Sequence, residues 1–250
     1  MTELPPCYRC HCQPCECADG ITLYHADCRE VLPLLEPGSV ELVLTDPPYA
    51  SGARNDAHRQ VRGSMLRSLE DDNWFSHDSM TTWGFQWFLR SVLVIIRPAL
   101  RLGTHLYWFT DWRMTPTVYG MLEAHGYRVN HCLVWDKQHF GMGTYWRNQH
   151  ENIVFASVGQ PTAMLDRGRG SVITTAAVRS QNRQHPTEKP ASLLRTILMA
   201  VPGNTVLDPF AGSGTTGRAC KDLDRKCIMV EIEQKYCDII VERLRQEVLF

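Results

Sequence analysis

A short apolar run that stops at two consecutive prolines constrains this chain more than any other stretch. Residues 41–45 read Glu-Leu-Val-Leu-Thr, a β-type pattern, and Asp46, Pro47, Pro48 and Tyr49 follow directly. Proline lacks an N–H, fixes its own φ and pushes the preceding residue towards extended geometry, so the strand must end at a stiff corner. At the carboxyl end of a parallel strand, this corner would present the Asp46 carboxylate, the Pro47 carbonyl and the Tyr49 ring to a ligand.

These three groups suit a planar heterocycle that carries an exocyclic amino group. The carboxylate of Asp46 and the carbonyl of Pro47 can each accept one N–H while the heterocycle stacks on Tyr49. Adenine and cytosine both meet this description. The alternative is a rigid turn with a packed tyrosine, because such dipeptides commonly occur in loops.

A glycine-rich turn follows a second apolar strand. Residues 205–217 read Thr-Val-Leu-Asp-Pro-Phe-Ala-Gly-Ser-Gly-Thr-Thr-Gly. Gly212 and Gly214 would let the backbone approach a ligand closely, and the helix that follows offers unpaired N–H groups. Neither the triphosphate-binding loop nor the GxGxxG fingerprint is matched. The next apolar run, residues 226–231, ends in Glu231, a carboxylate placed to bind ribose hydroxyls.

Together these motifs resemble the S-adenosylmethionine-dependent amino-methyltransferases of DNA. The Asp-Pro-Pro-Tyr motif precedes the Phe-Ala-Gly-Ser-Gly motif, and residues 185–190, His-Pro-Thr-Glu-Lys-Pro, lie just ahead of the latter. This order is similar to the permuted β class of the family, from about Ile21 to the C-terminus. The resemblance implies a Rossmann-like α/β fold with circularly permuted motif order. Its sheet would have seven mostly parallel strands and an antiparallel edge hairpin.

The resemblance also implies roles for individual residues. Asp46, Pro47, Pro48 and Tyr49 would be catalytic, and S-adenosylmethionine would be the cofactor. The residues implied to contact the cofactor are Asp27, Thr187, Lys189, Asp208, Phe210, Gly212, Gly214, Thr215 and Glu231. For Asp27, which ends the strand-like run that starts at Ile21, the alternative is an N-cap for the segment after it.

Composition places the chain among ordinary globular proteins. It has 250 residues, of which 44% are hydrophobic and 21% charged, enough for one α/β core. We expect a Cys-rich leader at 1–20 and a catalytic domain at 21–250. The sequence shows neither an apolar run of membrane-spanning length nor the basic, apolar start of a signal peptide, so a cytoplasmic protein is expected.

The net charge of −1 does not by itself indicate a nucleic-acid-binding protein. Two basic clusters in loop-like sequence favour double-stranded DNA as the partner, against the alternative of a solvated surface with a chance bias. The first cluster comprises Arg54, Arg59, Arg62 and Arg67. The second comprises Arg167, Arg169, Arg179, Arg183 and Lys189, which with Glu188 give a formal +4.

Five of the ten cysteines fall within residues 7–17. In a cytosolic chain such spacing indicates a metal site more than disulfides. Two Cys-x2-Cys pairs, Cys7 with Cys10 and Cys12 with Cys15, predict a structural zinc site, with Cys17, His11 or Cys28 as spare ligands. Only one residue separates the two pairs, which makes it difficult for both to bind the same ion. The alternative is a disordered or redox-labile tail.

The remaining chain alternates strands and helices, which predicts a mostly parallel sheet. Residues 50–80, polar and aperiodic, are expected to form a cover over DNA or cofactor. Residues 141–151 would either line a pocket for an extruded base or form a structural loop. A short target-recognition region is expected at about 157–185, and the helix after it at Ala191 to Ala200.

The predicted reaction is direct transfer of a methyl group to adenine N6 after base flipping. Cytosine N4 is the nearest alternative, since the same amino-group chemistry serves both; Asp46 favours adenine by family tendency only. RNA or protein-glutamine methylation and a non-catalytic DNA-binding module are less favoured. The resemblance leaves a homodimer and a cognate restriction nuclease open as partners.

Overall fold

The computed structural model describes residues 3–48, 82–141, 145–178 and 188–246. The predicted cover at 50–80 therefore lies outside the described residues, as do Tyr49 and Thr187. The strands of the sheet are β1 Ile21–His25, β2 Val40–Thr45, β3 Leu100–Thr110, β4 Arg128–Asp136, β5 His150–Ser157, β6 Val172–Thr174, β7 Thr205–Asp208 and β8 Lys226–Glu231. The helices are α1 Cys28–Val31, α3 Thr82–Ile96, α4 Thr115–Ala124, α5 Ala191–Ala200, α6 Thr215–Asp222 and α7 Gln234–Arg245, with 3-10 turns η1 Leu32–Leu34 and η2 Arg97–Ala99.

The strands form one twisted sheet in the order β1-β8-β7-β2-β3-β5-β4-β6. Strands β1, β8, β7, β2 and β3 run parallel, whereas β5 lies antiparallel between β3 and β4. This confirms the predicted fold class, a mostly parallel sheet with an antiparallel hairpin. The described sheet has eight strands instead of seven, because β6 adds to the outer side of β4. Three residues carry too little periodicity for a strand to be predicted there.

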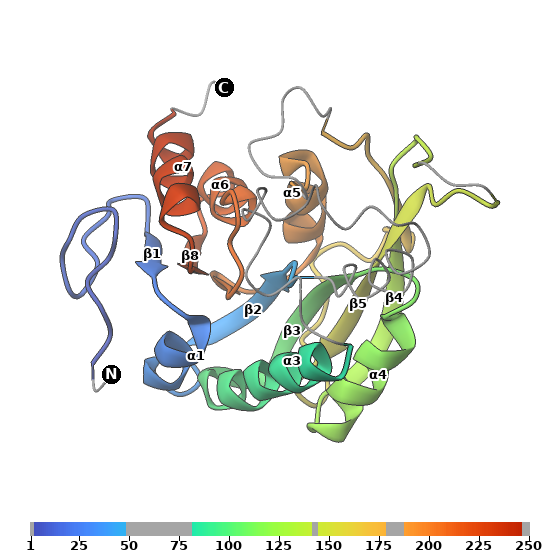
Figure 1. The fold of residues 1–250 in the computed structure, drawn as a ribbon, viewed down its shortest axis with the longest axis horizontal. Helices are drawn as coiled ribbons and strands as arrows, with labels where there is room; N and C mark the ends of the chain where they lie inside the picture. The colour runs from blue at the N-terminus through green and yellow to red at the C-terminus, as the bar shows by residue number, and fades with distance from the viewer. Residues whose placement is uncertain (1–2, 49–81, 142–144, 179–187, 247–250) are drawn as a thin grey trace, which may run out of the picture.

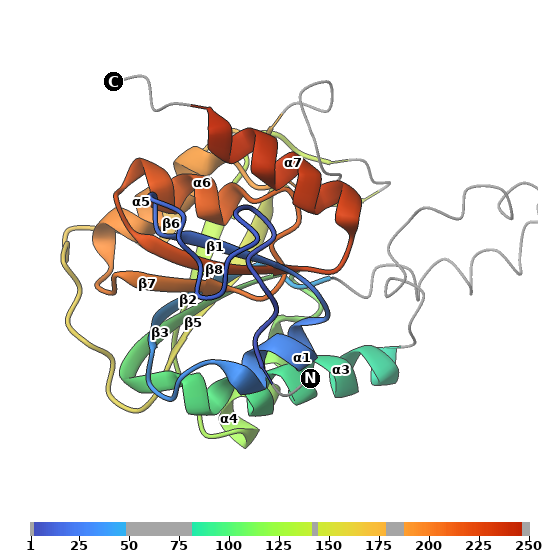
Figure 2. The same ribbon diagram turned by 90° about the vertical axis from the view of Figure 1, so that its left-hand side faces the viewer.

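Helices cover both faces of the sheet (Figures 1 and 2). Helices α1, α3 and α4 pack on one face, and α5, α6 and α7 pack on the other. Strand β2 shows how the sequence builds both cores: Val43 points into the first, while Leu42 and Leu44 point into the second. A strand buried on both faces reads as a continuous apolar run, as residues 42–44 do.

Prolines set the helix boundaries near the sheet. Helix α3 ends at Ile96, and Pro98 lies in the 3-10 turn that leads to β3. Pro190, with extended φ and ψ, caps the start of α5, which spans the predicted residues. In the described ranges no helix is both long and apolar enough to cross a membrane.

The parallel strands place their carboxyl ends at one edge of the sheet. Strands β2 and β7 are direct neighbours, with Leu42 opposite Val206 and Val43 opposite Leu207. The two motifs that the sequence singled out, after β2 and after β7, therefore meet at this edge although about 160 residues separate them.

Candidate active site

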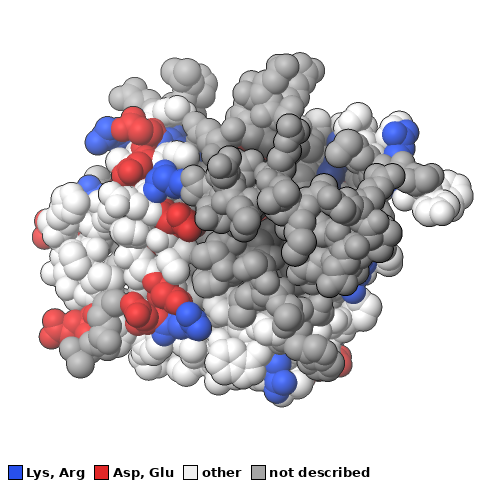
Figure 3. All heavy atoms as spheres, in the orientation of Figure 1, with Lys and Arg blue, Asp and Glu red and all other residues white. Residues whose placement is uncertain are grey.

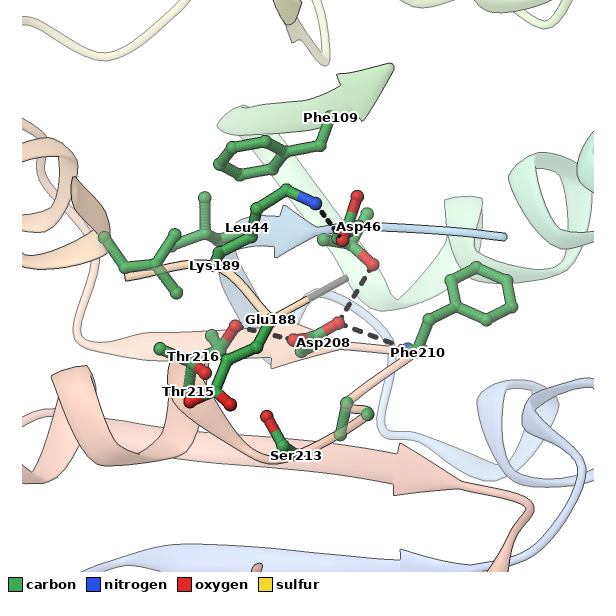
Figure 4. Close-up of a pocket in the computed structure, with 14 residues that line it drawn as sticks. Leu44, Asp46, Phe109, Glu188, Lys189, Asp208, Phe210, Ser213, Thr215 and Thr216 are labelled. Atoms are coloured by element: carbon green, nitrogen blue, oxygen red, sulfur yellow. Dashed lines mark hydrogen bonds and ion pairs between the residues drawn. The ribbon is translucent and has the colours of Figure 1, made fainter. Parts of the chain in front are cut away.

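Two acidic side chains from neighbouring strand ends form the centre of the site (Figure 4). Asp208 is the last residue of β7, and Asp46 directly follows β2. Thr45 joins the two strands by donating its hydroxyl to Asp208 Oδ1 at 2.9 Å. The polar residue before Asp-Pro-Pro-Tyr thus orients the acid of the second motif.

Asp208 is fully enclosed, with only 3% of its surface exposed. Its other oxygen accepts from the Thr216 hydroxyl at 2.6 Å, and the Phe210 N–H approaches Oδ1 at 3.2 Å. Burial raises the pKa of Asp208 to about 6, against the opposing effect of these hydrogen bonds, and the charge of Asp46 raises it further. A cationic group bound here would favour the ionised form.

Asp46 is held by a lysine from a distant segment. Lys189 forms an ion pair with Asp46 Oδ2, and a second with Glu151 Oε2 at 3.3 Å. Its ammonium also lies 5.3 Å from the centre of the Phe109 ring. Burial acts to lower the pKa of Lys189, but the two carboxylates outweigh burial and raise it. Lys189 therefore stays charged and fixes the orientation of Asp46.

This arrangement corrects one expectation about Lys189. The sequence grouped it with surface arginines that would contact phosphates, whereas its side chain is buried against two carboxylates. Arg169 of the same cluster pairs with Asp166. On the face in Figure 3, basic and acidic side chains of the described residues are interspersed and form no single basic patch. Arg179 and Arg183, with Arg54, Arg59, Arg62 and Arg67, lie outside the described residues.

The glycine-rich turn leads from β7 into α6. Gly212 and Gly214 have φ of 52° and 76°, left-handed values that favour glycine. A Cβ on Gly214 would lie 2.6 Å from Ile240 Cγ1 of α7, so any larger residue there would force Ile240 to move. The turn is thus shaped by helix packing as much as by any ligand.

Glu231 braces this turn from the end of β8. Its carboxylate accepts from the N–H groups of Gly212 and Glu233, each at 2.8 Å. Burial raises the pKa of Glu231 to about 7, against the lowering effect of these N–H groups. Binding of ribose hydroxyls by Glu231 stays a prediction.

A pocket opens between Asp46, the glycine-rich turn and the start of α5. It is lined by Leu44, Thr45, Asp46, Phe109, Glu188, Lys189, Leu194, Asp208, Phe210, Ala211, Gly212, Ser213, Thr215 and Thr216. Six predicted site residues are in this set. Asp27, Gly214 and Glu231 lie outside it, and so do Pro47 and Pro48.

Asp27 acts as the N-cap that the sequence offered as an alternative. Its side chain accepts from the Arg29 N–H at 2.8 Å and pairs with the Arg29 guanidinium at 2.5 Å. Strand β1 pairs with β8, so Asp27 lies beside the strand end that carries Glu231. Its contact with the cofactor remains a prediction.

The hairpin between β4 and β5 extends past the same edge of the sheet. Backbone hydrogen bonds from Lys137 to Gln149 and from Gly141 to Asn148 continue the pairing beyond β4 and β5. Tyr145 and Trp146 are almost completely exposed there, and the Arg147 guanidinium lies 3.7 Å from the centre of the Phe140 ring. Glu151 at the base of the hairpin pairs with Lys189, which ties the hairpin to Asp46.

The leader gathers four sulfur atoms in one place. Cys7, Cys10, Cys15 and Cys17 have Sγ atoms within 4.8 Å of one another. This group differs from the predicted set of Cys7, Cys10, Cys12 and Cys15, because Cys17, one of the predicted spare ligands, takes the place of Cys12. The sulfur of Cys12 lies outside the group, 3.3 Å from the Cys10 carbonyl, because one residue is too short a link between two pairs around one point.

A DNA methylase family model for N6 and N4 methylation matches residues 40–242, most of the chain and all of the pocket described above. The chain belongs to this DNA methylase family. The methylase is 27% identical over 253 residues to the type II methyltransferase M2.DpnII of Streptococcus pneumoniae, with 90% of each chain covered. It is 26% identical over 256 residues to the type II methyltransferase M.HinfI of Haemophilus influenzae, covering 90% of this chain and 68% of that one.

Solved structures share the fold of this methylase. The complex of M1.HpyAVI with SAM matches with a TM-score of 0.67 at 22% identity, covering 90% of this chain and 100% of the other. The cytosine-N4-specific PvuII DNA methyltransferase matches with a TM-score of 0.69 at 15% identity, covering 92% and 88% of the two chains. At these identities the likeness concerns the fold.

Sequence reasoning missed several groups that complete the methylase site. Arg243 of α7 donates to Thr215 Oγ1 at 2.7 Å and to Glu188 Oε1 at 2.5 Å, and so holds two residues that line the pocket. Glu151 and Phe109 flank Lys189. These residues occur in none of the motifs that the sequence analysis identified.

Proposed function

We propose that this methylase transfers a methyl group from S-adenosylmethionine to the exocyclic N6 of adenine in double-stranded DNA. The observation that carries the proposal is the Asp46 carboxylate at the rim of the pocket, fixed by a buried Lys189. A rigid acceptor beside a glycine-rich turn is what an amino-group methyltransferase requires.

The pocket fits the cofactor chemically. S-adenosylmethionine, when bound, supplies an electrophilic methyl group on a positively charged sulfonium. Asp208 provides negative charge at the pocket, which suits the positive charge of the cofactor, whereas the charge of Asp46 is balanced by Lys189. The left-handed turn at Gly212 and Gly214 keeps the backbone open at the start of α6. Glu231, one strand away, would accept ribose hydroxyls, and Asp27 is the next carboxylate along that edge.

Asp46 would act on the amino group of the target base. That nitrogen is a poor nucleophile because its lone pair is delocalised into the ring. Accepting one N–H at Asp46 and another at the Pro47 carbonyl favours a pyramidal nitrogen. The same contacts would stabilise the positive charge that develops on the nitrogen as the N–C bond forms and the methyl group leaves sulfur; the nitrogen then loses one proton to water. Lys189 is a positioning residue, since it contacts Asp46 rather than the base.

Access to the base requires that it leave the duplex, which costs stacking energy. The extended β4–β5 hairpin suits this step, because it presents exposed Tyr145 and Trp146 on the same edge as Asp46. Aromatic side chains can insert between or stack on bases. We propose that this hairpin contacts the opened duplex. Tyr49, proposed to stack on the flipped base, lies outside the described residues.

The deciding experiment is incubation with methyl-labelled S-adenosylmethionine and mixed genomic DNA, followed by digestion to nucleosides. Labelled N6-methyladenine is the expected product. Labelled N4-methylcytosine would keep the role of Asp46 and overturn the choice of base. An unlabelled DNA digest from protein that binds the cofactor would refute the proposal.

A further inference from the structure

The structure assigns a structural zinc site to the leader, with Cys7, Cys10, Cys15 and Cys17 as its four thiolate ligands. In a tetrahedral site, zinc–sulfur bonds of about 2.3 Å place the sulfurs about 3.8 Å apart. Cys10 Sγ and Cys15 Sγ lie 3.8 Å apart, and all four sulfurs fall within 4.8 Å of one another. The cluster is already close to the geometry that a single ion needs.

A cation lies beside the sulfur cluster. Arg9 Nη1 donates to the Ile21 carbonyl at 2.7 Å, and the Cys15 sulfur lies 4.0 Å from the same oxygen. The Arg9 guanidinium, which also pairs with Asp19, would offset part of the negative charge of a site with four thiolates.

The site would fasten the leader to the open edge of the sheet. Strand β1 is outermost in the described sheet. The Tyr8 N–H donates to the Leu23 carbonyl at 2.7 Å, and Arg9 Nη1 donates to the Ile21 carbonyl at 2.7 Å. Tyr8 Oη also reaches Asp238 of α7 at 2.8 Å. The leader thereby covers edge carbonyls that would otherwise invite pairing with another chain.

A metal explains how so short a segment stays folded. Residues 3–20 contain no helix or strand, and Cys7 is the leader residue counted in the buried core. Ordering such a segment costs conformational entropy that a few hydrogen bonds hardly offset, whereas binding of one ion by four side chains closes all its loops at once. Four thiolates in a tetrahedral arrangement favour zinc, which has no redox chemistry to disturb a structural role.

Metal analysis of the full chain, purified under reducing conditions without chelator, tests this assignment. We expect about one zinc per chain, and after exchange with Co²⁺ the absorption bands typical of tetrahedral cobalt–thiolate sites. Cys17→Ser should lose the metal, while its matched control Cys12→Ser should keep it. Removal of zinc should make the leader more sensitive to proteolysis and leave the cleavage pattern of the rest of the chain unchanged.

The metal content of the wild-type protein tests the assignment without relying on any variant that could fail to fold. A wild-type chain with no stoichiometric metal, with iron in place of zinc, or with paired disulfides would overturn the assignment. Equal loss of zinc from both serine variants would overturn the ligand set. Neither result bears on methyl transfer, because the cluster lies at the β1 end of the sheet, three strands from β2.

Discussion

Lys189 forms a buried ion pair with Asp46 across 143 residues of sequence. The same ammonium reaches Glu151 at the base of the β4–β5 hairpin, so one cation joins the strand end, the segment before α5 and the hairpin. A buried charge without partners is very costly, so this lysine and its carboxylates depend on one another.

Asp46→Asn should lower the rate of methyl transfer by at least about 10²-fold, a size typical for loss of one stabilising group in a transition state. Binding of S-adenosylmethionine should change little, because Asp208 and the glycine-rich turn are untouched. Single-turnover transfer and calorimetry measure the two quantities. Asp224→Asn, at an exposed turn on the opposite edge of the sheet, is the matched control and should behave as wild type. An active D46N protein would contradict the mechanism.

Lys189→Met should destabilise the protein by about 3 kcal/mol, because two carboxylates lose their shared cation. The transfer rate should also fall, because Asp46 loses the cation that fixes its orientation. Denaturant unfolding and single-turnover transfer test the two points. Adding Glu151→Gln to this variant should restore part of the stability. A variant that transfers methyl groups at the normal rate would show that Lys189 does not position Asp46.

Glu231 should make the free protein less stable as pH rises. Its pKa is about 7 in the folded chain, above the ordinary value of 4.5, so its stabilising contribution is complete below about pH 4.5 and is lost as pH passes 7. We expect the difference in free energy of unfolding between wild type and Glu231→Gln to fall by about 3 kcal/mol from pH 4.5 to 8. Urea unfolding of both proteins across this range measures it, and parallel curves would refute the prediction.

Gly214→Ala should destabilise the protein more than Gly126→Ala does. Both glycines have left-handed φ, 76° and 78°, so both variants carry a similar backbone cost of about 1–2 kcal/mol. Only at Gly214 would the new Cβ meet Ile240, at 2.6 Å, while Gly126 has open space. Overpacking should add about 1–3 kcal/mol. Thermal unfolding compares the two, and Ile240→Ala should relieve part of the additional cost.

Trp146→Ala should weaken DNA binding without changing stability, because the ring is fully exposed. Loss of one stacking contact corresponds to about 1–3 kcal/mol of binding free energy. Fluorescence anisotropy with a DNA duplex at fixed salt measures the affinity. The control is Trp87→Ala, because Trp87 is also exposed but lies on helix α3, away from the β4–β5 hairpin. Equal affinity for both variants would remove the hairpin from the proposed DNA interface.

Local chemistry fixed much of the fold in advance. Pro47 and Pro48 end β2, Pro190 starts α5, and the apolar spacing of residues 191–200 gives that helix its bounds. Asp46, Asp208 and the glycine-rich turn were identified because each depends on neighbours within a few residues. The N-cap role of Asp27 could also be predicted, because it depends only on residues of the helix that follows directly.

Other features arise only where distant segments meet. In the sequence, Lys189 looks like a surface cation. It is buried because the fold places the end of β2, the start of β5 and the segment before α5 side by side. Cys17 replaced Cys12 because the path of the leader, and not the Cys-x2-Cys spacing, brings sulfurs to one point. Strand β6 exists because β4 offers it an edge, and Arg243 reaches Glu188 because α7 packs beside α6. Periodicity and capping act over a few residues. Ion pairs and ligand sets depend instead on which strand ends and loops the order of strands in the sheet places next to one another.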